Sequence, residues 1–186
     1  MNIYLISDTH FGHDREFIYN PRGFNSVEEM NETIIENWNK TVNQDDIVYH
    51  LGDLFNSDNT DFINNIIDRL NCKSISLIKG NHDTMMRLDI YRKIDKIKEI
   101  KTADEIYYRD RYFYLSHYPT LTADLTSDPK HCVYNLHGHI HTKKKFYEDR
   151  PYMYNVSCDS QNCIPISLDK IMEEIDDEIA ECFKYI

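Results

Sequence analysis

The decisive feature of this sequence is a series of five polar stretches: Asp8-Thr9-His10-Phe11-Gly12-His13, Gly52-Asp53, Gly80-Asn81-His82-Asp83, His117 and Gly138-His139-Ile140-His141. Each one follows a short apolar run that is typical of a buried β-strand. Glycine is otherwise scarce, with five in 186 residues, and four of the five lie in these stretches. We interpret each of the four as a backbone position that has no room for a side chain.

Strand and helix patterns alternate in the first part of the chain. We expect strands over residues 2–6, Ile47–Leu51 and Ile75–Ile78, and amphipathic helices over residues 27–42 and 62–70. The first helix begins with a capping box, in which a serine is followed three residues later by a glutamate. This order of elements implies right-handed crossovers and a parallel sheet.

The pattern changes after residue 100. Residues Glu105–Tyr108 and Tyr112–Ser116 flank a polar turn and predict an antiparallel hairpin, which suggests an antiparallel second half. Two further short strands are expected over Val133–Leu136 and Tyr152–Val156. After Ser167, apolar residues recur at every fourth position among acidic ones, which predicts a closing helix with one buried face.

The five stretches are expected to meet in space, because the carboxyl ends of parallel strands gather at one edge of a sheet. Any one of these histidines alone is better explained as a packed or surface residue, and it is their combination with the glycines that indicates a site. The donors are carboxylate and amide oxygens together with imidazole nitrogens. This mixture suits Mn, Fe, Co, Ni or Zn better than calcium or a thiolate zinc site.

In order and spacing, the stretches resemble the motifs of the calcineurin-like metallophosphoesterases: Asp-x-His, Gly-Asp, Gly-Asn-His-Asp, a single His and Gly-His-x-His. All five are present between residues 8 and 141. The downstream segments Asn155-Val156 and Pro165-Ile166-Ser167-Leu168 are similar to those of small bacterial and phage members. The resemblance implies an α/β fold, a four-layer α/β/β/α sandwich with mixed sheets and a binuclear metal site at the strand ends.

The resemblance also implies a set of metal ligands. One ion would be bound by Asp8, His10, Asp53 and His141, and a second by Asp53, Asn81, His117 and His139. A carboxylate such as Asp53 can bridge two cations, whereas a neutral imidazole cannot. Manganese is the expected metal, with Fe, Ni, Zn and Co as alternatives. Two such ions can share a hydroxide, lower its pKa and neutralise phosphate oxygens.

This ligand set leaves His82 free for catalysis. A histidine titrates near neutral pH, so His82 would donate a proton to a phosphate oxygen or to the leaving alkoxide. Asp83 is expected to hold an imidazole in place by a hydrogen bond. The implied catalytic residues are therefore His82 and Asp83.

The implied function is hydrolysis of a small phosphate mono- or diester, with nucleotides and cyclic nucleotides among the candidates, by a metal-bridging hydroxide. Two alternatives remain: a non-catalytic scaffold, as in the retromer subunit of this fold, and a nuclease of the same superfamily. Such nucleases carry capping domains and basic surfaces, for which this chain has no room. The choice of substrate depends on the loops over residues 11–25 and 118–131, whose chemistry the motifs do not define.

Composition limits the partners and the compartment. A net charge of −11 disfavours binding to a nucleic acid polymer, which needs clustered Lys and Arg. No apolar run approaches the ~20 residues that a membrane-spanning helix requires, and the first apolar run is too short for a secretion signal. The five cysteines form no Cys-x-x-Cys pair. We therefore expect a single cytoplasmic domain over residues 1–186 with free thiols.

Several residues outside the ligand set allow two interpretations. Contact with substrate and an ordinary structural role are both open for His13, Arg15, Arg22 and Tyr118. Packing and hydrogen bonding are the expected roles of His50 and His137, and an ordinary structural role is expected of His131. For Cys158 and Cys163, two unrelated thiols are favoured over a redox pair.

Overall fold

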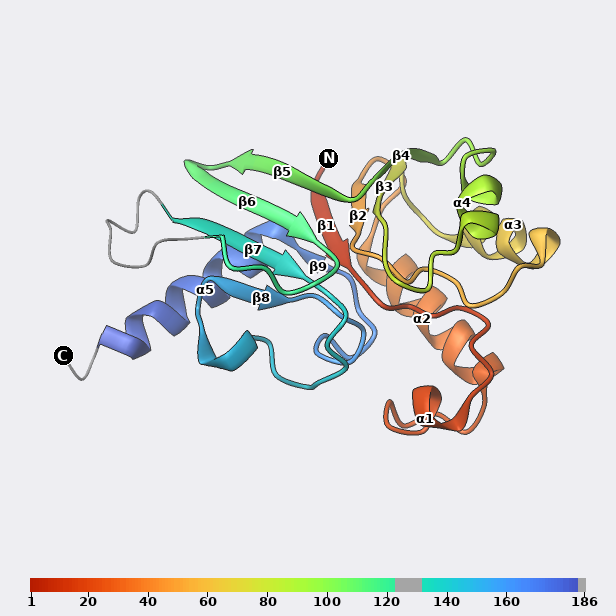
Figure 1. Ribbon diagram of the computed structural model, residues 1–186, viewed down its shortest axis with the longest axis horizontal. Coiled ribbons are helices and arrows are strands. Elements are labelled where there is room, and N and C mark those ends of the chain that lie inside the picture. The colour runs from red at the N-terminus through yellow and green to blue at the C-terminus, as the bar shows by residue number, and fades with distance from the viewer. Residues whose placement is uncertain (123–131, 184–186) are drawn as a thin grey trace.

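The computed structural model describes residues 1–122 and 132–183 (Figure 1). Its first sheet has the strand order β4-β3-β2-β1-β9. Strands β1 to β4 are parallel, as the alternating pattern predicted, and β9 pairs with β1 in the antiparallel direction. The strands are β1 (Ile3–Ile6), β2 (Ile47–His50), β3 (Ser74–Ile78), β4 (Ile97–Lys101) and β9 (Ile166–Ser167).

The second sheet has the order β5-β6-β7-β8, formed by β5 (Ala103–Tyr108), β6 (Arg111–Ser116), β7 (Val133–His137) and β8 (Met153–Asn155). The predicted hairpin is confirmed, because β5 and β6 are antiparallel. The prediction of a wholly antiparallel second half is wrong, because β6, β7 and β8 pair in parallel. Long connections precede β7 and β8, and connections of that length allow a strand to return in the same direction.

Helices cover the sheets: α1 (Glu16–Tyr19), α2 (Val27–Thr41), α3 (Thr60–Arg69), α4 (Met85–Tyr91), the 3₁₀ helix η2 (Tyr147–Asp149) and α5 (Leu168–Phe183). The predicted cap of α2 is present, since Ser26 Oγ accepts a hydrogen bond from the Glu29 amide. The Glu29 carboxylate accepts a hydrogen bond from the backbone amide of Asn25. Among the described residues, no helix is both long and apolar enough to cross a membrane.

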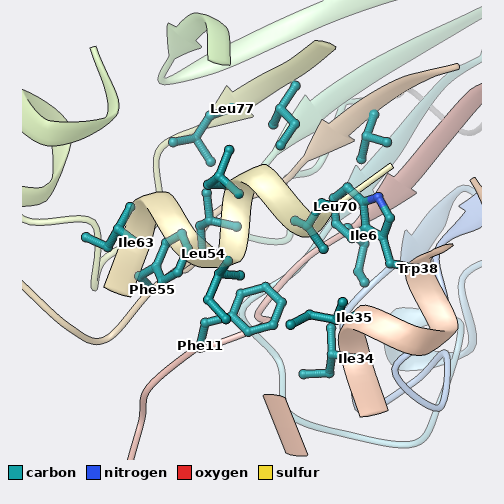
Figure 2. Close-up of a cluster of buried hydrophobic side chains, with 14 of the residues drawn as sticks. Ile6, Phe11, Ile34, Ile35, Trp38, Leu54, Phe55, Ile63, Leu70 and Leu77 are labelled. Atoms are coloured by element: carbon teal, nitrogen blue, oxygen red, sulfur yellow. The ribbon is translucent and has the colours of Figure 1, made fainter. Parts of the chain in front are cut away.

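The first core cluster lies between the first sheet and helices α2, α3 and α4. Figure 2 shows its side chains, including Phe11, Trp38 and Leu54, interlocked between the helices and the strands. Trp38 is fully buried, and its indole Nε1 donates a 2.7 Å hydrogen bond to the Asn71 carbonyl oxygen. This cluster holds the strand ends of the first sheet in fixed positions.

The second core cluster joins the other face of the first sheet to the second sheet and α5. Leu5 belongs to this cluster whereas its neighbour Ile6 belongs to the first, so β1 is buried on both faces. Phe113 of β6 and Ile175 of α5 are fully buried here. In Figure 1 the second sheet and α5 lie on the opposite side of the first sheet from α2, α3 and α4. The predicted α/β class with two mixed sheets is therefore confirmed.

Replacing Ile34 by alanine tests the packing of α2. Ile34 is fully buried in the first core cluster, so Ile34→Ala is expected to lower the free energy of unfolding by about 2–5 kcal/mol. Urea unfolding followed by circular dichroism measures this loss. The matched control on the same helix is Glu36→Ala, whose side chain is 66% exposed. Equal losses in both variants would contradict this packing.

Candidate metal centre

The site lies where strands of the two sheets end. Asp8, Asp53 and Asn81 follow β1, β2 and β3 of the first sheet. His117 and His139 follow β6 and β7 of the second sheet. The parallel pairing that was not predicted for β6 and β7 is what brings both of these histidines to one edge, because parallel strands end on the same side.

The backbone is left-handed at four of the predicted ligands. The φ angles are 56° at Asp8, 49° at His10, 57° at Asp53 and 69° at His139. This conformation is uncommon for residues with a side chain and costs on the order of 1–3 kcal/mol each. Backbone hydrogen bonds hold two of these turns: the Asp8 amide donates to the Gly52 carbonyl at 2.9 Å, and the His10 amide donates to the Asp53 carbonyl at 3.0 Å.

Two glycines allow the loops to approach closely. Gly52 has a φ of +97°, and a Cβ atom there would lie 2.5 Å from Nδ1 of His117. A Cβ atom at Gly138 would collide with Ser7 Oγ and with the Asp8 carboxylate. At both positions the expectation that a side chain has no room is confirmed.

The first half of the site centres on Asp8, which is fully buried. Its Oδ2 accepts hydrogen bonds from Ser7 Oγ at 2.5 Å and from the His139 amide at 2.9 Å. Its Oδ1 is buried without a hydrogen-bond partner in the described part of the chain. That oxygen lies 4.0 Å from Nε2 of His10 and 3.8 Å from Nε2 of His141. Burial raises the pKa of Asp8.

The two imidazoles beside Asp8 present their lone pairs to the same space. His141 donates from Nδ1 to Asp159 Oδ2 at 2.9 Å, so its Nε2 carries the lone pair when the ring is neutral. This Nε2 lies 3.3 Å from Nε2 of His10. A buried carboxylate oxygen and two imidazole nitrogens that converge in this way, within 4.8 Å of one another, fit a divalent cation.

The second half of the site centres on Asp53. Its Oδ2 lies 3.7 Å from His10 Nε2 and 3.5 Å from His117 Nε2, so this carboxylate lies between the two halves. His117 Nδ1 donates to the Leu51 carbonyl at 2.8 Å, which leaves the lone pair on Nε2. That lone pair faces Oδ1 of Asn81 at 2.9 Å. Two acceptors facing each other are again suited to a cation.

All seven predicted ligands thus lie together. The seventh, His139, has its ring centroid 5.0 Å from that of His117. His82 is beside them: its amide donates to Asp53 Oδ1 at 2.7 Å, and its half-buried ring lies 5.2 Å from that of His10. Within residues 1–122 and 132–183, the ring nitrogens of His82 have no hydrogen-bond partner. The ring is therefore available to a substrate.

Asp83 differs from its expected role. Its buried carboxylate accepts hydrogen bonds from the amides of Asp53 at 2.9 Å, Gly80 at 2.8 Å and Leu54 at 3.3 Å, and from the Tyr91 hydroxyl at 3.4 Å. These partners are backbone amides and a phenol, not an imidazole. Burial raises the pKa of Asp83. Asp83 therefore joins the loop after β2 to the loop after β3, because it satisfies amides that the two turns leave free.

Arg22 has a structural role in this geometry. Its side chain is 2% exposed, and it donates to the Asp8 carbonyl at 2.8 Å and to Asp159 Oδ2 at 2.7 Å. It is therefore engaged away from solvent. Asp159 was not among the predicted site residues, because no motif marks it.

His13 lies closer to the site than its sequence context indicated. It is buried, and its Nδ1 lies 3.4 Å from Nδ1 of His10, so one ring can support the other. Burial lowers the pKa of His13 to about 4, which keeps it neutral near pH 7.

Tyr118 is 50% exposed, with its ring centroid 4.7 Å from that of His139. Arg15 is exposed and donates to the Asp14 carbonyl.

Two further histidines, His50 and His137, were predicted to pack in the interior. His50 and His137 are fully buried; His50 Nε2 lies 3.0 Å from Thr9 Oγ1, and His137 Nδ1 lies 2.9 Å from the Gly138 carbonyl oxygen. Both therefore pack as expected. His131 and residues 123–131 of the second substrate loop lie outside the described residues.

All five cysteines are free, and Cys158 and Cys163 are buried.

Known proteins resemble this chain over most of its length. The sequence profile of the calcineurin-like phosphoesterase superfamily domain matches residues 1–156. The chain is 37% identical over 179 residues to the uncharacterized protein MJ1445 of Methanocaldococcus jannaschii, covering 94% of this chain and 91% of that protein. It is 31% identical to the gene 66 protein of Mycobacterium phage L5, covering 76% and 78%. A crystal structure of AQ665 from Aquifex aeolicus, a protein of unknown function, matches with a TM-score of 0.69 and 26% identity, covering 92% and 98%.

Gly138→Ala is expected to weaken metal binding, because the added methyl group would displace the Asp8 carboxylate. Equilibrium dialysis against Mn²⁺ measures the number of ions bound per chain. The matched control is Gly23→Ala, where a Cβ atom meets nothing within 4 Å although φ is +90°. Gly23→Ala should bind as the unsubstituted protein does. Equal binding by the two variants would contradict the proposed close approach at Gly138.

His50 is expected to make stability depend on pH. Burial lowers its pKa from 6.5 to about 3, so below pH 6.5 the unfolded chain takes up a proton that the folded chain does not. As the pH is lowered from 6.5 to about 3, this proton uptake should therefore lower the free energy of unfolding by about 1.4 kcal/mol for each pH unit. His50→Gln should lose this contribution. Urea unfolding at several pH values in the presence of a chelator measures how the free energy of unfolding depends on pH in the unsubstituted protein and in His50→Gln. Identical pH dependence in the two proteins would contradict the lowered pKa of His50.

Proposed function

The chain belongs to the calcineurin-like phosphoesterase superfamily, and on this premise we propose that it is a metal-dependent hydrolase of small phosphate mono- or diesters. One observation carries the proposal. Buried carboxylate oxygens of Asp8 and Asp53 face imidazole lone pairs, and Asp8 Oδ1 has no hydrogen-bond partner among the described residues. Such a cluster is costly unless cations neutralise it.

We assign two divalent cations to this cluster. Asp8, His10, Asp53 and His141 would hold one, and Asp53, Asn81, His117 and His139 would hold the other. Manganese is the proposed metal, and Fe, Co, Ni and Zn suit the same oxygen and nitrogen donors. When bound, such a pair lowers the pKa of coordinated water and neutralises phosphate oxygens during in-line displacement.

His82 is the proposed acid. Its amide is fixed on Asp53 Oδ1 at 2.7 Å, while its ring stays beside His10 with free nitrogens. A phosphate ester bound at the cluster would therefore meet an imidazole on that side. Donation of its proton to the leaving oxygen avoids the formation of a free alkoxide, and such catalysis contributes about 10²–10⁴-fold in rate.

The substrate is proposed to be a small ester, not a nucleic acid polymer. The net charge of −11 repels a long polyanion, whereas a single phosphate group meets mainly the local charge of the cations. The complete donor set and the free His82 ring favour an enzyme over a scaffold. The five free cysteines support a cytoplasmic location, where thiols remain reduced.

Metal-stripped protein is expected to be inactive, and Mn²⁺ is expected to restore hydrolysis of an aryl phosphate mono- or diester. His82→Ala should lower the rate by about 10²-fold or more while binding the same number of ions. Steady-state rates and the bound metal content measure the two effects separately. Testing a mono- and a diester in parallel also gives the ester preference.

The control is Met85→Ala, which changes an exposed side chain just beyond the same loop and should leave the rate unchanged. Full activity of metal-loaded His82→Ala would rule out the proposed acid. A protein that binds two ions and hydrolyses neither ester would argue against a general phosphoesterase.

A further inference from the structure

Asp159 contacts the candidate site from outside every motif. It follows β8, beyond the residues that match the superfamily profile. Its carboxylate is 12% exposed, and its Oδ2 accepts a 2.9 Å hydrogen bond from Nδ1 of His141. A carboxylate that accepts a hydrogen bond from the far nitrogen of a metal-binding imidazole fixes both the tautomer and the direction of that ring.

Asp159 is itself held in place by Arg22. Arg22 donates from Nη2 to Oδ2 at 2.7 Å and from Nε to Oδ1 at 3.1 Å, which forms a two-pronged ion pair. The Arg22 side chain is 2% exposed, so the pair is shielded from solvent. The Asp159 carboxylate therefore has little freedom to turn away from His141.

The same arginine reaches the other side of the first half of the site. Its Nη2 also donates to the Asp8 carbonyl at 2.8 Å, at a residue whose backbone is left-handed. The loop that carries Asp159 is joined to this strand as well, because the Cys158 amide donates to the Ser7 carbonyl at 2.9 Å. Arg22 and Asp159 thus connect the backbone of Asp8 to the ring of His141.

His141 needs such support more than its partners. Its side chain is 36% exposed, whereas that of His10 is 1% exposed and is confined by packing. A half-exposed imidazole without a fixed Nδ1 partner could rotate, and it would then present no lone pair to the cluster. The hydrogen bond that His141 donates to Asp159 removes this freedom.

We propose that Asp159, held by Arg22, is a positioning residue that orients His141 and sets the affinity of the Asp8, His10 and His141 half of the site for a divalent cation. This inference rests on the proposed two-metal function. It assigns no contact between Asp159 and the substrate. The other half, with Asn81 and His117, does not depend on this ion pair.

Titration of metal-free protein with Mn²⁺ tests the proposal, with electron paramagnetic resonance to count free and bound ions. The unsubstituted protein should bind two ions. Asp159→Ala should bind one of them about 10–100-fold more weakly and retain the other. Asp159→Asn keeps an acceptor for His141 but loses the charge. Its affinity for the same ion should therefore lie between those of the unsubstituted protein and of Asp159→Ala. Asp159→Asn also tests the proposal if the alanine variant does not fold.

The matched control is Asp176→Ala, which removes another Arg–Asp pair, to Arg111 at 2.6 Å, between α5 and β6. It should bind two ions normally. Unchanged binding in both Asp159 variants would overturn the inference while leaving the proposed function intact. Equal weakening of both ions would also overturn it, because that result indicates general destabilisation. Fewer than two ions on the unsubstituted protein would overturn the proposed function, and the inference with it.

Discussion

The structure depends on one constraint: two carboxylates, Asp8 and Asp53, are buried beside imidazole lone pairs at the meeting edge of two sheets. Such groups cannot be left unpaired without a large cost. The surrounding loops supply part of the compensation, since amides of His82 and His139 donate to these carboxylates. The left-handed turns, the glycines without side chains and the amide contacts of Asp83 all serve to bring these charges together. Asp8 Oδ1, which has no hydrogen-bond partner among the described residues, is where we propose a cation.

Much of the fold could be predicted because it follows from local patterns. The strands of the first sheet and helix α2 have strong periodicity, and Ser26 marks the helix start. Strands β4 and β9 and helices α1 and α4 were not predicted. Strand β9 and the two helices are short, and β4 has the sequence IKEIK, in which charged residues interrupt the apolar pattern. The direction of β7 and β8 also escaped prediction, because alternation of apolar residues identifies a strand but not the orientation of its partner.

The site could be predicted where glycine and histidine stand together in the sequence, and all seven predicted ligands lie in one place. Asp83 was correctly placed near the site, but it contacts backbone amides, which leave no trace in sequence. Arg22 and Asp159 form their ion pair across 137 positions of the chain. No local pattern can indicate such a contact, and the folded structure is needed to find it.

The antiparallel pairing of β9 with β1 has a consequence for biosynthesis. Strand β1 leaves the ribosome before β9, so its outer edge stays open until β9 has been made. In the interval, unpaired amides and carbonyls along that edge are able to pair with another chain. The support of His141 waits for nearly the same segment, because Asp159, which accepts its hydrogen bond, precedes β9 closely. The nascent chain therefore gains the outer partner of β1 and the Asp159 contact to His141 at nearly the same moment.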